Sequence, residues 1–62
     1  MTEYAYVRLR HDVTVGGVTY RTGVRGVIVH RHADGIGYEV EFEHPAFRVV
    51  TLTARDIQPD HG

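Results

Sequence analysis

The dipeptide Asp34-Gly35 constrains the fold of this chain more than any other feature, because it separates two runs of alternating apolar and polar residues. Asp-Gly is typical of a two-residue type I′ turn, in which both central residues need a positive φ. Such a turn joins antiparallel strands and pairs Ala33 with Ile36, which sets the register of the whole hairpin. The register predicts one shared apolar face, made of Val27, Val29, Val40 and Phe42.

The opposite face of the same hairpin is predicted to be polar. His30 lies opposite Glu39 in this register, and Ile28 lies opposite Glu41. Glu39, Glu41 and Glu43 then form an acidic stripe on one face of their strand. Such a stripe is typical of a solvated face paired with neighbouring basic side chains. Its other interpretation is a binding surface for a basic partner.

Strand-forming residues also dominate the rest of the chain, and helical periodicity is absent. Asp12–Thr22 contains Gly16-Gly17 and is expected to be a long loop, with or without a short irregular hairpin. Thr53–Ile57 can form a single helical turn at most. Residues 1–3 and 59–62 are expected to fray. The predicted strands are Tyr4–His11, Val24–His32, Ile36–Glu43, Ala46–Thr51 and a short segment around Ile57 and Gln58.

The connection around His44-Pro45 leaves two registers open. If these two residues occupy a tight turn, Phe47 joins the core, while Val50 and Leu52 point outward. A bulge near Val49-Val50 would instead turn Val50 and Leu52 inward, and bulges are common where small sheets curl. The sequence pattern is compatible with both arrangements.

Two motifs, taken with the order of the elements, resemble a known family. Gly23–Val29 has the form Gly-x-x-Gly followed by apolar residues, and Tyr38–Phe42 has the form Tyr-x-Val-x-Phe. They resemble a family of short bacterial proteins of uncharacterised function with an SH3-like barrel. That barrel is similar to the barrel of the nitrile hydratase beta subunit and to KOW-type barrels. The resemblance covers Val7–Pro59.

The resemblance implies an all-β fold, a small five-stranded, partly open SH3-like barrel with one short helical turn near the C-terminus. A single domain would then span residues 1–62. The family supplies no activity to carry over. Nitrile hydratase draws its metal ligands from its other subunit, so the resemblance implies no metal either. The expected core consists of Val7, Leu9, Val27, Val29, Tyr38, Val40, Phe42, Phe47, Leu52 and Ile57.

Composition narrows the possible functions. A domain of 62 residues buries only about 60% of its unfolded surface, so its stability margin is small. The absence of cysteine excludes disulfides and thiolate metal sites. Serine is also absent, and so small a domain has little volume for a substrate pocket, so we expect no enzymatic activity. Without a long apolar run, the chain is predicted to be cytoplasmic and to have no membrane contact.

A metal site is conceivable at one place. His30 and His32 are two residues apart on one predicted strand and therefore share a face, with Glu39 across from them. Two histidines and a carboxylate suit a transition metal. The alternative is an exposed cross-strand pair between His30 and Glu39, with His32 beside the turn. We expect no metal and no cofactor, although the sequence leaves this site open.

Tyrosine and arginine side chains gather in two segments of the chain. They lie on the first predicted strand and around the glycine-containing loop, and exposed Tyr with Arg is typical of protein interfaces. The predicted partner-binding residues are Tyr6, Arg8, Arg10, Tyr20, Arg21 and Arg25.

These residues predict a small non-enzymatic protein-interaction module, of an accessory, antitoxin-like or subunit type. It would act through the exposed Tyr/Arg face or through an open strand edge, with another protein chain or a second copy as its partner. The alternative is a KOW-like nucleic-acid-binding barrel, because interleaved basic and aromatic residues can hold single strands. A formal net charge of −1 argues against nucleic acid.

Overall fold

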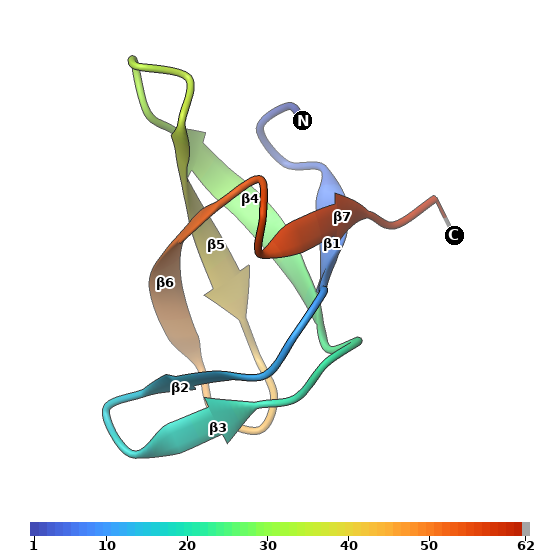
Figure 1. Cartoon of the computed structure of the whole chain (residues 1–62), viewed down its shortest axis with the longest axis vertical. Coiled ribbons are helices and arrows are strands. Elements are labelled where there is room, and N and C mark those ends of the chain that lie inside the picture. The colour runs from blue at the N-terminus through green and yellow to red at the C-terminus, as the bar shows by residue number, and fades with distance from the viewer. Residues whose placement is uncertain (62) are drawn as a thin grey trace.

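The computed structural model describes residues 1–61 and contains only strands, turns and loops within them. One five-stranded antiparallel sheet, in the order β6-β5-β4-β1-β7, curls into half a barrel, and β2 and β3 form a separate hairpin (Figure 1). The all-β prediction is therefore confirmed, and Asp12–Thr22 holds a regular hairpin. The strands are β1 Tyr6–Leu9, β2 Val13–Val15, β3 Val18–Tyr20, β4 Arg25–Arg31, β5 Gly37–Phe42, β6 Arg48–Thr53 and β7 Ile57–Pro59.

The β4–β5 hairpin closes through a wider loop than the predicted two-residue turn, so that prediction is wrong. The His32 N–H donates to the Gly37 carbonyl at 2.9 Å, which leaves four residues, 33–36, in the loop. Within the loop only Gly35 has a positive φ, while the Asp34 carboxylate accepts the N–H of Ile36 at 2.8 Å. This side-chain bond favours a wider turn. A two-residue turn with both φ values positive occurs instead at Gly16-Gly17, between β2 and β3.

A β-bulge in β4 reverses the side chains that were expected to face inward. His30 lies opposite Glu39 as predicted, but the register shifts between Ile28 and His30. Ile28 therefore lies opposite Val40 and is fully buried. Val27 and Val29 are only partly buried, so their predicted place in the core is wrong. The physical reason is that one extra residue in a strand moves every residue beyond it to the other face.

The β5–β6 connection is longer than a tight turn and needs no bulge. Phe42 lies opposite Arg48, and the register continues without a shift to Val50 and Leu52, whose side chains point inward. Phe47 stays in the loop, 68% exposed, so its predicted place in the core is wrong. A one-residue offset from the tight-turn register is sufficient to exchange the two faces.

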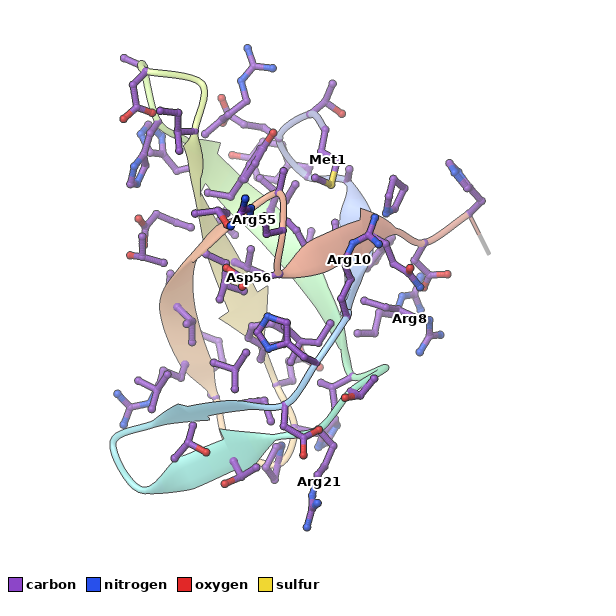
Figure 2. All side chains as sticks on the ribbon, in the orientation of Figure 1. Met1, Arg8, Arg10, Arg21, Arg55 and Asp56 are labelled. Carbon is purple, nitrogen blue, oxygen red and sulfur yellow. The ribbon has the colours of Figure 1, made fainter. Side chains whose placement is uncertain are left out.

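The predicted helical turn near the C-terminus is absent, and a hydrogen-bonded turn between β6 and β7 replaces it (Figure 2). The Asp56 N–H donates to the Thr53 carbonyl at 2.9 Å, and the Thr53 N–H donates to the Asp56 carboxylate at 2.8 Å. These bonds satisfy both backbone groups of Thr53 without a helix. The chain then extends again at Ile57, which pairs with Leu9.

Because of the hydrogen bonds in this turn, we expect the stability of the protein to fall in acid. Two hydrogen bonds lower the pKa of the Asp56 carboxyl below its ordinary value of 3.8. The larger effect comes from the Thr53 N–H, and a smaller one comes from the His11 ring, whose Nε2 lies 2.8 Å from Asp56 Oδ1. A carboxyl with a depressed folded pKa contributes stability above its unfolded pKa, and that contribution is lost as the pH falls through the folded value. We expect Asp56→Asn to lose about 1 kcal/mol at neutral pH and to flatten the acid limb of the stability curve. Urea unfolding between neutral pH and strong acid measures both, and an unchanged acid limb would contradict the assignment.

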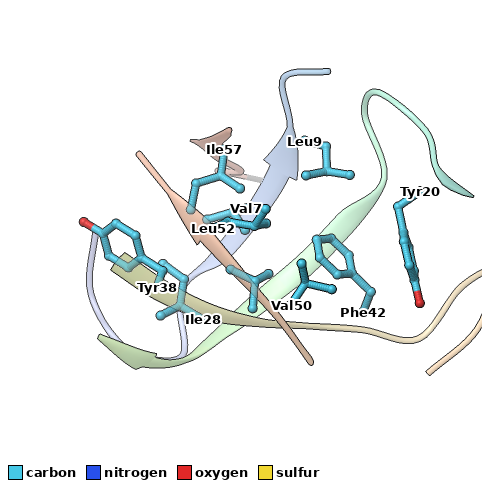
Figure 3. Close-up of a cluster of buried hydrophobic side chains, with 10 residues drawn as sticks. Val7, Leu9, Tyr20, Ile28, Tyr38, Phe42, Val50, Leu52 and Ile57 are labelled. Carbon is cyan, nitrogen blue, oxygen red and sulfur yellow. The ribbon is translucent and has the colours of Figure 1, made fainter. Parts of the chain in front are cut away.

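The core lies inside the curl of the sheet (Figure 3). Tyr20, which was expected to be exposed, is fully buried, and its ring centroid lies 5.0 Å from that of Phe42. Its hydroxyl donates to the Ala46 carbonyl at 2.6 Å, so burial leaves no polar atom without a partner there. The hairpin thus covers one end of the sheet. The buried side chains are Val7, Leu9, Tyr20, Ile28, Tyr38, Val40, Phe42, Val50, Leu52 and Ile57.

Candidate functional site

The outer face of β1 and β4 brings three of the predicted residues together. Because Val7 and Leu9 point into the core, Tyr6 and Arg8 point outward, and Arg8 lies opposite Arg25 on β4. The Arg25 guanidinium carbon lies 3.8 Å above the centre of the Tyr6 ring, which is cation–π geometry.

Asp60 holds the two arginines in place. Its Oδ2 atom lies 3.2 Å from Nε of both Arg8 and Arg25, and only 10% of its side chain is exposed. Arg8 also donates to the Gly23 carbonyl at 2.8 Å. Two cations directly opposite each other in a sheet repel, so the shared carboxylate offsets that repulsion. The Asp60 N–H donates to the Tyr6 carbonyl at 2.9 Å, so the expected fraying does not extend to this residue.

A hollow of about 510 Å³ lies beside the stacked pair. Tyr6 of β1 and Arg25 of β4 line it, and so do Glu41 of β5 and Glu43 just after β5, both from the acidic stripe. Aromatic, cationic and anionic groups therefore meet around one depression. The residues that line it are Tyr6, Arg25, Gly26, Val27, Glu41, Glu43 and His44.

The other three predicted residues lie elsewhere. Tyr20 is in the core, and Arg21, 78% exposed, is 3.6 Å from the Asp12 carboxylate at the β2–β3 end of the molecule (Figure 2). The Nε–H of Arg10 donates to the Ile57 carbonyl at 2.9 Å. Partner binding by any of the six residues stays a prediction.

Sequence reasoning missed Asp60 and His44 as parts of this face. Asp60 follows a short strand that pairs with β1, and this pairing alone brings it to the arginines. In the sequence, Asp60 is a single acidic residue close to the end of a strand. Such residues are too common to indicate a site.

His30 on β4 and His32 just after this strand lie next to each other, and His32 is bonded to Glu39. The rings of His30 and His32 are 5.9 Å apart, and His32 Nε2 lies 2.5 Å from a Glu39 oxygen. Glu39 also accepts the Thr51 hydroxyl at 2.9 Å, and the His32 bond followed by this one lowers the pKa of Glu39. Within residues 1–61, no group of three or more His, Asp or Glu side chains is arranged to hold a metal ion.

Comparison with known proteins adds no relationship. The chain matches no family model, no curated protein and no solved structure. In the part of the chain that the structure describes, no helix has the length and apolar character needed to cross a membrane. The face around Tyr6 and Arg25 is therefore interpreted from its own geometry.

Proposed function

We propose that this chain is a small non-enzymatic protein-interaction module that binds its partner through the hollow beside Tyr6 and Arg25. The stack of Arg25 on Tyr6 at 3.8 Å carries the proposal. Tyr and Arg, together with Trp, are enriched at the energetic centres of protein interfaces. Arg25 is already oriented by Asp60 at 3.2 Å, so less side-chain entropy is lost when a partner binds.

We also propose that the domain is a partly open SH3-like barrel. The sheet order β6-β5-β4-β1-β7, with the β2–β3 hairpin inserted between β1 and β4, supports this classification. In such a barrel the outer face of β1 and β4 remains available to another chain.

Charge around the hollow favours a protein partner with a basic side chain. Glu41 and Glu43 line the depression together with Tyr6, and a lysine or arginine of a partner can pair with these carboxylates. The same carboxylates repel phosphate, while Arg8 and Arg25 share Asp60. These contacts favour the protein-binding interpretation over the KOW-like one.

The test compares variants of the immobilised protein for what each retains from a lysate of its own organism. We expect at least one protein to be retained by the unchanged chain and lost with Tyr6→Ala and Arg25→Ala. Truncation of an interface centre costs about 2 kcal/mol, or about thirtyfold in affinity. Arg21→Ala is the matched control, because Arg21 is an exposed arginine with a single carboxylate neighbour away from the hollow.

Two outcomes would contradict the proposal. One is identical retention by all of these variants, and the other is no retained protein at all. Labelled single-stranded and duplex oligonucleotides, titrated at two salt concentrations, address the alternative. Salt-sensitive binding would favour the KOW-like function.

A further inference from the structure

The two edges of the five-stranded sheet differ sharply. β7 is three residues long and ends in Pro59, which has no N–H to offer a neighbouring strand. β6 is six residues long and carries no charge from Val49 to Thr53, and among the strands of residues 1–61 it is hydrogen-bonded to β5 alone. Proteins usually protect such an edge with charges, proline or a covering segment. We propose that β6 pairs antiparallel with β6 of a second copy of this chain, on a surface separate from the proposed function at Tyr6.

The backbone groups that β6 offers can be deduced from the turn that follows it. Both backbone groups of Thr53 bond Asp56 and therefore point away from β5. Backbone groups alternate in direction along a strand, so those of Thr51 and Val49 point the same way as those of Thr53. The open edge thus presents the N–H and C=O groups of Val49 and Thr51, while Thr53 marks the end of the available segment.

These groups match themselves about a two-fold axis. If the axis passes beside Val50, Val49 of each copy lies opposite Thr51 of the other. Directly opposed residues of this kind exchange both of their backbone hydrogen bonds, and the symmetry repeats the exchange. An axis beside Thr51 would instead place Val49 opposite Thr53, whose backbone groups are already used.

Exposed apolar side chains lie at both ends of the same edge. Phe47, 68% exposed, immediately precedes β6, and Val49 on the strand is 45% exposed. At the other end lies a second hollow of about 360 Å³, lined by Gly35, Ile36, Thr53, Ala54 and Arg55. The proposed register brings Phe47 of each copy opposite Thr53 of the other, beside this hollow. One aromatic anchor and one depression thus meet twice in the dimer.

The size of the surface predicts a reversible dimer. A stable interface buries about 800 Å² per partner, which is about one fifth of the 4015 Å² that this chain exposes. We expect a six-residue edge with one aromatic anchor to bury less than that. We therefore expect association that rises with concentration rather than a permanent dimer.

Sedimentation velocity over a range of concentrations tests the pairing. The average mass should rise from 7.0 kDa toward twice that value. Val49→Lys should weaken association by roughly tenfold or more, because a lysine on an edge opposes pairing. Thr19→Lys, the same charge change at an exposed residue of β3, should associate as the unchanged chain does. Circular dichroism confirms that both variants are folded.

Monomeric behaviour of the unchanged chain at every concentration would overturn the proposal, as would full association of Val49→Lys. Tyr6→Ala should leave the mass unchanged. The dimer and the partner-binding face can therefore fail independently of each other.

Single cysteines test the register, because the chain has none of its own. Opposed residues in this geometry have Cα atoms about 5.5 Å apart, which a disulfide can span. In a mixture of Val49→Cys and Thr51→Cys chains, the mixed 49–51 disulfide should form faster than either symmetric one. Predominance of the symmetric 51–51 product would overturn the axis beside Val50.

Discussion

Replacing Phe42 with alanine is expected to remove most of the free energy that keeps this protein folded. The Phe42 side chain is fully buried and contacts the Tyr20 ring at a centroid distance of 5.0 Å. Truncating a buried phenylalanine costs about 3–5 kcal/mol, because the cavity closes only partly. A domain of this length has about 3–9 kcal/mol of stability in total. Urea unfolding followed by circular dichroism measures the loss.

The same substitution at Phe47 is the control. Phe47 is 68% exposed, although its sequence context predicts a buried residue. Phe47→Ala should therefore change the free energy of unfolding by about 0.5 kcal/mol or less. Both variants are compared at low concentration, where the proposed dimer would not contribute. Equal losses from Phe42→Ala and Phe47→Ala would show that the inward register of β5 and β6 is wrong.

Gly26→Ala should be the most damaging single added methyl group. Gly26 is buried on the inner face of β4, and a Cβ atom built there lies 2.7 Å from Phe42 Cε1 and 2.8 Å from Val40 Cγ1. Neither side chain can move without disturbing the core, because both are fully buried. Overpacking of this kind costs about 1–3 kcal/mol. Thermal unfolding should show a clearly lowered midpoint.

Gly37→Ala tests whether the expected loss of stability comes from crowding in the core or from the loss of a glycine itself. A Cβ atom at Gly37 also meets a side chain, the His32 ring, but about a third of the His32 side chain is exposed. The ring can rotate toward solvent, at the expense of its bond to Glu39. We expect Gly37→Ala to lose less stability than Gly26→Ala. The reverse order would contradict the close approach of Phe42 to β4.

The outward residues of β1 could be predicted from the sequence, but not which other residues join them at the candidate site. The alternation of β1 placed Tyr6 and Arg8 on the outer face, because strand periodicity depends only on neighbouring residues. That Arg25 stacks on Tyr6 follows from the β1–β4 register, and that Asp60 joins them follows from the β1–β7 pairing. Contacts between distant segments have no local signal in a single sequence. Tyr20 was assigned to the surface for the same reason, since only the folded chain brings Phe42 and the Ala46 carbonyl to it.

The sequence by itself determined the all-β class and the inward residues of β1, β5 and β7. The local alternation of apolar and polar side chains there favours a strand with one buried face, and no distant contact changes it. The inward faces of β4 and β6 were decided by the tertiary structure. One extra residue in β4 and one offset in the β5–β6 loop exchange the two faces, with Ile28 and Val50 buried in place of Val29 and Phe47. Such a shift changes little in local preference. The shift in β4 is favoured because the Phe42 ring packs against Gly26, which has no side chain to occupy that space.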